Sequence, residues 1–255
     1  MSGVLGVEAL KLRRAGVVRV TAVVLALACP LLAAGMTRAA AAGGESQLSV
    51  KAAALITRPG WPGYLDVVGQ ILTVAVLLGG GVVTSWVFGR EFVQGTVTGL
   101  FATATPRWQV AAAKLAAVIA ALVSICLAAV LLAIALGPLA GLPRPDAAVW
   151  PAAGRVIIGA LLMALLTTPL AWVASARRGY LPAIGALLGL IVVTQIVTAA
   201  GAGGWFPYAT PSLWLGMAGP AAAAAVTAPQ LAAAVPVSAA GAAATIWWWR
   251  RAELS

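Results

Sequence analysis

The acidic side chains of this sequence are few and scattered, and histidine is absent. The six carboxylates are Glu8, Glu45, Asp66, Glu91, Asp146 and Glu253. Zinc hydrolases need histidine, cysteine and carboxylate ligands, and acyl transfer usually needs a base beside the nucleophile. No G-x-x-x-x-G-K-[ST] loop is present to bind nucleotide phosphates. We therefore expect a non-catalytic chain without a bound cofactor, in which any driven process takes its energy from another protein.

The composition indicates the elements that carry these residues. Hydrophobic residues make up 62% of the chain, charged residues 9%, and the mean hydropathy is +1.03, values typical of an integral membrane protein. A membrane-spanning helix needs about 20 apolar residues. Six runs of that length lie at 17–36, 64–88, 110–136, 152–174, 180–199 and 229–249. Lipid cannot satisfy open backbone groups, so the sequence predicts an all-α fold, with 1–255 forming one transmembrane domain.

The basic residues predict the orientation of this domain. An even number of spans places both termini on one side of the membrane. Eleven basic residues lie on that side: Lys11, Arg13, Arg14, Arg19, Arg90, Arg107, Lys114, Arg177, Arg178, Arg250 and Arg251. Five lie on the other: Arg38, Lys51, Arg58, Arg144 and Arg155. The positive-inside rule therefore predicts cytosolic termini in the cell inner (plasma) membrane. Topology and anionic lipid, rather than nucleic acid, account for the net charge of +10.

The polar residues within the spans are neutral. Away from the span ends they are Gln70, Thr73, Thr84, Ser124, Thr167, Thr168, Thr194 and Gln195. A carrier driven by protons or sodium often uses an ionisable group at membrane depth. The sequence therefore disfavours coupling through a buried carboxylate.

Residues 89–114, GREFVQGTVTGLFATATPRWQVAAAK, lie between the second and third spans. At about 100° per residue, one side of a helix here is apolar, formed by Phe92, Val93, Val97, Leu100, Phe101 and Ala104. The other side is small or weakly polar, formed by Glu91, Gln94, Gly95, Thr98, Ala102 and Thr105. We expect a helix on the membrane surface, with its polar side facing a partner. Pro106 ends or restarts this helix, and Arg107 and Lys114 anchor the next span at the headgroups.

The order of charged, small and proline residues in this segment resembles the E…GT…L…P…R…K pattern of permease subunits of the ABC type 2 exporter family. The matching residues are Glu91, Gly95, Thr96, Leu100, Pro106, Arg107 and Lys114. The resemblance extends to the basic start of the chain, six spans, an outer segment rich in proline and glycine, and the basic end at Arg250 and Arg251. Phe92-Val93-Gln94 departs from the pattern, because it lacks the basic residue often found after the glutamate.

The resemblance implies a function and two sets of site residues. A coupling helix would rest on a separate ABC ATPase through Glu91, Gly95, Thr96, Leu100, Pro106 and Arg107. Two ATPase subunits, which bind ATP and magnesium, would serve two permease copies in a homodimer that exports an amphipathic or apolar molecule. The second and fifth spans would line the path through Gln70, Thr73, Thr194 and Gln195, and residues 207–228 would fold back as short helices.

Other interpretations of the sequence remain open. The threonines of the spans are equally suited to hydrogen bonds between helices of one subunit. The chain as a whole is also compatible with a stand-alone channel or carrier, or with a non-transporting membrane protein that serves as an immunity or scaffold protein.

Overall fold

The computed structural model describes residues 2–43, 47–56, 58–97, 99 and 105–252, and these residues form helices and turns with no β-strand among them. Six helical stretches are long and apolar enough to cross a membrane: Gly16–Ala42, Gly60–Val93, Arg107–Leu136, Val149–Ala176, Tyr180–Ala199 and Ala228–Arg251. Each contains one of the predicted runs. The all-α fold with six membrane-spanning stretches is therefore confirmed.

Three of these stretches are single helices, namely α5 (Gly60–Val93), α7 (Arg107–Leu136) and α10 (Tyr180–Ala199). The others are interrupted near prolines. The first comprises α2 (Gly16–Val23), a π-helical turn (Val24–Ala28) and α3 (Cys29–Ala42), while the fourth comprises α8 (Val149–Leu165) and α9 (Thr168–Ala176). Pro30 and Pro169 follow these breaks. Proline has no backbone N–H to donate, so a regular helix bends or changes its hydrogen bonding there. The sixth comprises α13 (Ala228–Ala232) and α14 (Ala234–Arg251).

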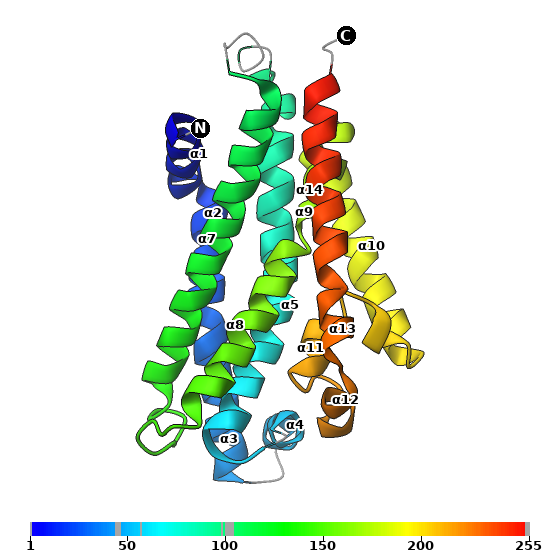
Figure 1. The fold of residues 1–255 in the computed structure, drawn as a ribbon. Coiled ribbons are helices and arrows are strands. Elements are labelled where there is room, and N and C mark those ends of the chain that lie inside the picture. Colours follow the sequence, from blue (N-terminus) through cyan, green and yellow to red (C-terminus); the bar gives the residue numbers. More distant parts are fainter. Residues whose placement is uncertain (1, 44–46, 57, 98, 100–104, 253–255) are drawn as a thin grey trace.

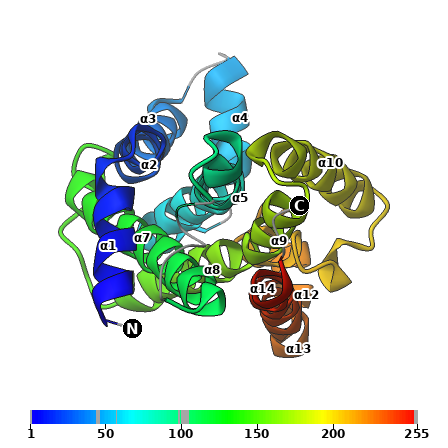
Figure 2. The same ribbon diagram turned by 90° about the horizontal axis from the view of Figure 1, so that it is seen from above.

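The central helix is α5, which contacts α3, α7, α8, α9 and α10. Figure 2 shows these helices arranged around it. Helix α1 (Ser2–Arg14) lies across the bundle axis at the end where both termini are found (Figures 1 and 2). Helix α4 (Gln47–Leu55) lies at the opposite end.

Two glycines allow helices to approach closely at the level of their backbones. A Cβ atom built on Gly89 would lie 2.3 Å from the backbone nitrogen of Tyr180, where α10 begins. One built on Gly241 of α14 would lie 2.6 Å from the backbone nitrogen of Pro169 in α9. These distances are too short for any larger residue. The two glycines therefore set the positions of α10 and α14 relative to the core.

The segment between α10 and α14 forms a 3₁₀ turn (Gly203–Trp205), α11 (Thr210–Trp214) and α12 (Pro220–Ala225), which confirms the expected short helices. After α11, the side chain of Leu215 enters the bundle between Gly69 and Gly159 and is fully buried. Gln70 Nε2 donates a hydrogen bond to the Leu215 carbonyl at 3.0 Å. Arg155 Nη2 donates to the Trp214 carbonyl at 2.6 Å. The segment is thus fixed to α5 and α8.

Candidate functional site

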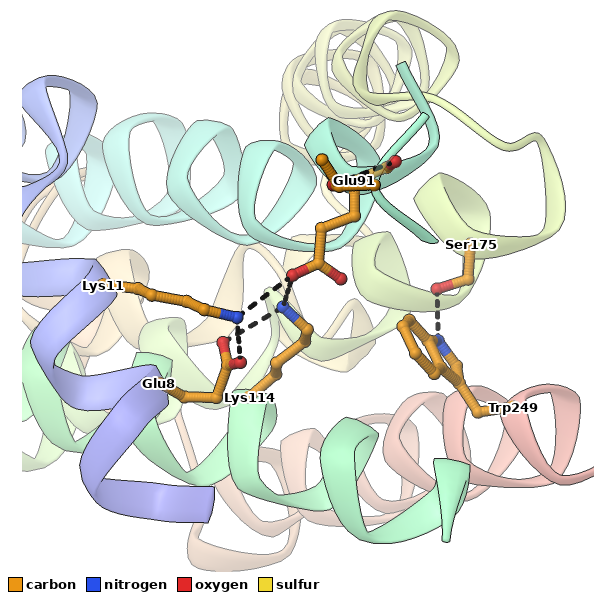
Figure 3. Close-up of polar contacts among 7 residues, drawn as sticks. Glu8, Lys11, Glu91, Lys114, Ser175 and Trp249 are labelled. Carbon is orange, nitrogen blue, oxygen red and sulfur yellow. Dashed lines mark hydrogen bonds and ion pairs between the residues drawn. The ribbon is translucent and has the colours of Figure 1, made fainter. Parts of the chain in front are cut away.

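Four charged side chains meet where α1, α5 and α7 converge, at the end of the bundle that carries the termini (Figure 3). Lys114 Nζ lies 2.8 Å from Glu91 Oε1 and 3.1 Å from Glu8 Oε2. Lys11 Nζ lies 2.7 Å from Glu8 Oε1 and 3.5 Å from Glu91 Oε1. We call Glu8, Lys11, Glu91 and Lys114 the ion-pair cluster. It joins three helices that are far apart in the sequence.

The position of each residue on its helix explains how the cluster forms. Glu8 and Lys11 are three residues apart on α1, so their side chains share one face of the helix. Glu91 lies in the last turn of α5, and Lys114 lies in the second turn of α7. The Lys114 side chain is fully buried, and Glu8 and Glu91 are 3% and 5% exposed. Burial of these charges is tolerated because each has an opposite partner and the cluster is neutral as a whole.

The surroundings of Glu8 alter its acidity. Burial raises the pKa of the Glu8 carboxyl. The charges of Lys114 and Lys11 and the hydrogen bonds from both lysines together lower the pKa by a larger amount, so the net pKa lies below the ordinary value of 4.5. The folded protein therefore favours the carboxylate form of Glu8. This ionisation stabilises the fold fully at pH values above 4.5, and the stabilisation is lost as the pH falls through the lower, folded-state pKa.

This linkage predicts how acid affects the protein in detergent. Below pH 4.5, the Tm of the native chain should fall more steeply than that of the Glu8→Gln variant, which carries no proton-dependent charge at this position. Near pH 7 the variant should be the less stable of the two, because Lys114 has lost one of its two anionic partners, and the two Tm values should converge as Glu8 becomes protonated in acid. Thermal unfolding followed by circular dichroism between pH 3 and pH 8, values chosen to bracket the carboxyl range, measures both effects. Parallel curves would contradict the assignment.

A second contact holds the end of α5 from another direction. Trp249 of α14 is fully buried, and its Nε1 donates a hydrogen bond to Ser175 Oγ of α9 at 2.9 Å (Figure 3). Phe88 and Phe92, on the last two turns of α5, meet the Trp249 ring edge to face, with centroids 6.2 Å and 6.1 Å away. The end of α5 is therefore fixed both by the ion-pair cluster and by this aromatic contact.

The region after α5 differs in part from its prediction. Helix α5 continues to Val93, and Gly95 then has a φ of +68°, a left-handed conformation suited to glycine at a helix end. Glu91 therefore belongs to α5, and the prediction that it faces outward as part of a separate helix is wrong. The placement of Lys114 at the headgroups is also wrong. Both side chains point into the protein, because each is the counter-charge that permits burial of the other.

The other predicted coupling residues lie in several environments. Gly95, Thr96 and Pro106 are exposed, and Pro106 directly precedes α7 as predicted. Arg107 Nη1 donates a hydrogen bond to the carbonyl of Ala252, which connects the start of α7 to the end of α14. Leu100 lies outside the described residues. The structure thus places Gly95, Thr96 and Pro106 on the surface, whereas Arg107 binds the end of α14 in the same chain.

The residues expected along a path also fall into two groups. Thr194 and Gln195 of α10 line a cavity of about 120 Å³, together with Ser212 of α11 and residues of α5 and α8. Gln70 and Thr73 are instead buried between α5 and the segment around α11. Ser212 Oγ and Thr73 Oγ1 are 3.1 Å apart, within hydrogen-bond distance. These two residues of α5 thus hold the segment that forms the cavity wall.

The sequence contained a signal for the ion-pair cluster that the prediction missed. Lys114 lies within the apolar run 110–136, where an unpaired charge is costly. A lysine there needs a carboxylate, and the sequence places Glu91 and Glu8 at the same end of the bundle. The contact between Trp249 and Ser175 has no comparable signal, because tryptophan at a span end is equally suited to the membrane interface.

The fold and these sites define a multi-pass membrane protein whose charged groups at one end of the bundle join its helices to each other. Residues 4–196 match the model of the family described as ABC-2 family transporter protein, and the chain therefore belongs to this family. It is a membrane permease component of an ABC transporter. Comparisons with curated proteins and with solved structures gave no match.

Proposed function

We propose that this permease exports an amphipathic or apolar molecule from the cytosol and is driven by a separate ATPase that contacts residues 94–106. The termini and the ion-pair cluster would lie on the cytosolic side of the inner membrane, as the distribution of basic residues predicts. The ATP and magnesium would be bound by the ATPase. Two permease copies would combine with two ATPase subunits. Family membership and the arrangement around residues 94–106 support this proposal.

One observation carries the proposal. Residues 94–106 are bracketed by Glu91, in the last turn of α5, and Lys114, in the second turn of α7, and these side chains form an ion pair of 2.8 Å. A force applied to the segment therefore acts on α5 and α7 as one unit. Glu8 extends the connection to α1. A partner bound at this end can in this way move the central helix, which is what coupling to ATP binding requires.

The cluster also has a property suited to a second conformation. Glu91 Oε2 is buried and has no hydrogen-bond partner among the described residues. A buried carboxylate oxygen without a donor is unfavourable. A conformation that supplies this donor would therefore compete with the present one. Two states of similar free energy are needed if binding of a nucleotide to the partner is to shift the population between them.

The transport path would follow α5 and α10, with Thr194 and Gln195 on its wall. Helix α10 has only 11% of its span buried within the chain, and positions Gly185 and Gly189 have open space beyond them. This G-x-x-x-G spacing permits close approach of another helix. We therefore place the second permease copy against α10, so that the cavity lies between subunits. Gln70 and Thr73 would control the path by holding the segment around α11.

The test is binding to an ABC ATPase encoded beside this chain. Gln94→Trp and Thr96→Arg change exposed side chains next to α5 and should leave the bundle folded. We expect each to reduce co-purification with the ATPase by about tenfold, the effect of losing about 1.4 kcal/mol of binding. Arg144→Trp, in an exposed loop at the opposite end, is the matched control and should bind normally.

Two outcomes would contradict the proposal. Unchanged co-purification of Gln94→Trp and Thr96→Arg would place the ATPase contact elsewhere. Passage of solute down its gradient through the purified chain alone, in liposomes without ATPase, would instead support a stand-alone channel or carrier. The mass of the intact complex, measured by light scattering, tests for two copies of each subunit.

A further inference from the structure

We propose that a groove between α1, α2 and α7 binds an anionic phospholipid, with its acyl chains along α7 and its phosphate at Arg13 and Arg19. The groove has a volume of about 670 Å³ and is lined by residues of these three helices. It is distinct from the ion-pair cluster and from the cavity beside α11. The proposal does not depend on which molecule the permease transports.

The wall of the groove is apolar over a depth that matches one leaflet. On α7 the lining begins with Ala116 and ends with Ile125. At a rise of about 1.5 Å per residue these positions are about 14 Å apart, close to half of the roughly 30 Å hydrocarbon core of a bilayer. The only polar wall residue on α7, Ser124, donates its hydroxyl to the Ala120 carbonyl at 2.8 Å. The wall is therefore suited to acyl chains.

The rim of the groove is cationic. Arg13 lies in the last turn of α1, the chain bends at Ala15, and Arg19 follows in α2. Arg19 Nε donates to the Arg13 carbonyl at 3.1 Å, which draws its guanidinium back toward the end of α1. Within the part of the chain that the structure describes, the ion pairs involve other basic residues, and neither arginine has an acidic partner. Two uncompensated positive charges thus meet at the mouth of an apolar groove.

This change of polarity favours a lipid over a protein partner. The groove is cationic at one end and apolar below it, which matches an anionic headgroup joined to acyl chains. A second copy of this chain is itself basic, with a net charge of +10 over its whole length, and would offer the rim like rather than opposite charge. Charge complementarity therefore identifies an anionic phospholipid as the occupant.

Native mass spectrometry can test this binding directly. The purified chain is mixed in detergent with equal amounts of phosphatidylglycerol and phosphatidylcholine that carry the same acyl chains. We expect retention of phosphatidylglycerol in preference to phosphatidylcholine. The double variant Arg13→Gln/Arg19→Gln should lose this preference. Each arginine should account for about a fivefold change in the ratio of retained phosphatidylglycerol to retained phosphatidylcholine. Ala120→Trp, which fills the exposed wall and keeps both arginines, should also reduce retention.

The control variant Arg14→Gln/Arg177→Gln removes the same charge from positions outside the groove lining. It should retain phosphatidylglycerol as the native chain does, and circular dichroism should show equal helix content in all variants. Equal retention of the two lipids by the native chain would overturn the proposal. A loss of phosphatidylglycerol preference in the control variant as large as that in Arg13→Gln/Arg19→Gln would also overturn it. So would normal retention by Ala120→Trp, or cross-linking of two chains through a photoreactive group at position 120.

Discussion

Replacing Lys114 with methionine is expected to destabilise the protein by about 3–5 kcal/mol, because breaking a buried ion pair leaves an uncompensated charge. Here both Glu8 and Glu91 would lose the fully buried ammonium that lies 3.1 Å and 2.8 Å from their oxygens. Methionine has a similar length, so the loss of charge rather than of volume dominates. Equilibrium unfolding in detergent micelles measures the change in the free energy of unfolding.

Two variants separate the contribution of the cluster from a general effect of removing a lysine. Lys51→Met removes an exposed lysine from α4 and should change the unfolding free energy by less than about 0.5 kcal/mol. The triple variant Glu8→Gln/Glu91→Gln/Lys114→Met should recover at least half of the loss, since neutral groups no longer need a counter-charge. A loss below about 1 kcal/mol in Lys114→Met would contradict the buried cluster.

The Lys114→Met variant also bears on coupling. If α5 and α7 move together through their ion pair, a folded preparation of this variant should bind the ATPase normally but show weaker stimulation of ATP hydrolysis by the permease. Binding depends on the exposed residues of 94–106, whereas stimulation depends on the connection behind them. Loss of binding and stimulation in proportion would indicate a purely structural role for the cluster.

Trp249→Ala should have an effect of similar size on stability. Removing a fully buried tryptophan costs about 3–5 kcal/mol through the lost contacts and the cavity left behind. At this site the change also removes the hydrogen bond to Ser175 and the edge-to-face contacts with Phe88 and Phe92. The end of α5 would then lose this aromatic contact and keep the ion-pair cluster. Thermal unfolding and proteolysis after residue 93 measure the two consequences.

The neighbouring Trp247 provides the matched control. It lies on the same helix but is 53% exposed, so Trp247→Ala should change the unfolding free energy by less than about 1 kcal/mol. Trp249→Phe keeps an aromatic ring and loses the N–H donor, for which we expect a loss of about 1 kcal/mol plus the reduced volume. Equal effects of the alanine variants at 247 and 249 would contradict the structural role given to Trp249.

The sequence by itself determined the membrane fold. Each predicted span lies within an observed helical stretch, because span length and hydropathy are set by the thickness of the bilayer and not by neighbouring helices. Pro106 likewise marked the start of α7, since proline is restricted locally in its own backbone. The order of residues from Glu91 to Lys114 was sufficient to indicate the family, which the match over residues 4–196 establishes.

Only the tertiary structure decided which way the charged side chains face. Glu91 was predicted to face a partner and Lys114 the headgroups, yet the two meet inside the bundle with Glu8, which is 106 residues from Lys114 in the sequence. Periodicity gives the relative angles of residues on one helix, but the rotation of each helix about its axis depends on close packing elsewhere. Contacts such as that of Gly89 with the backbone at Tyr180 fix this rotation, and no single segment of sequence contains both partners.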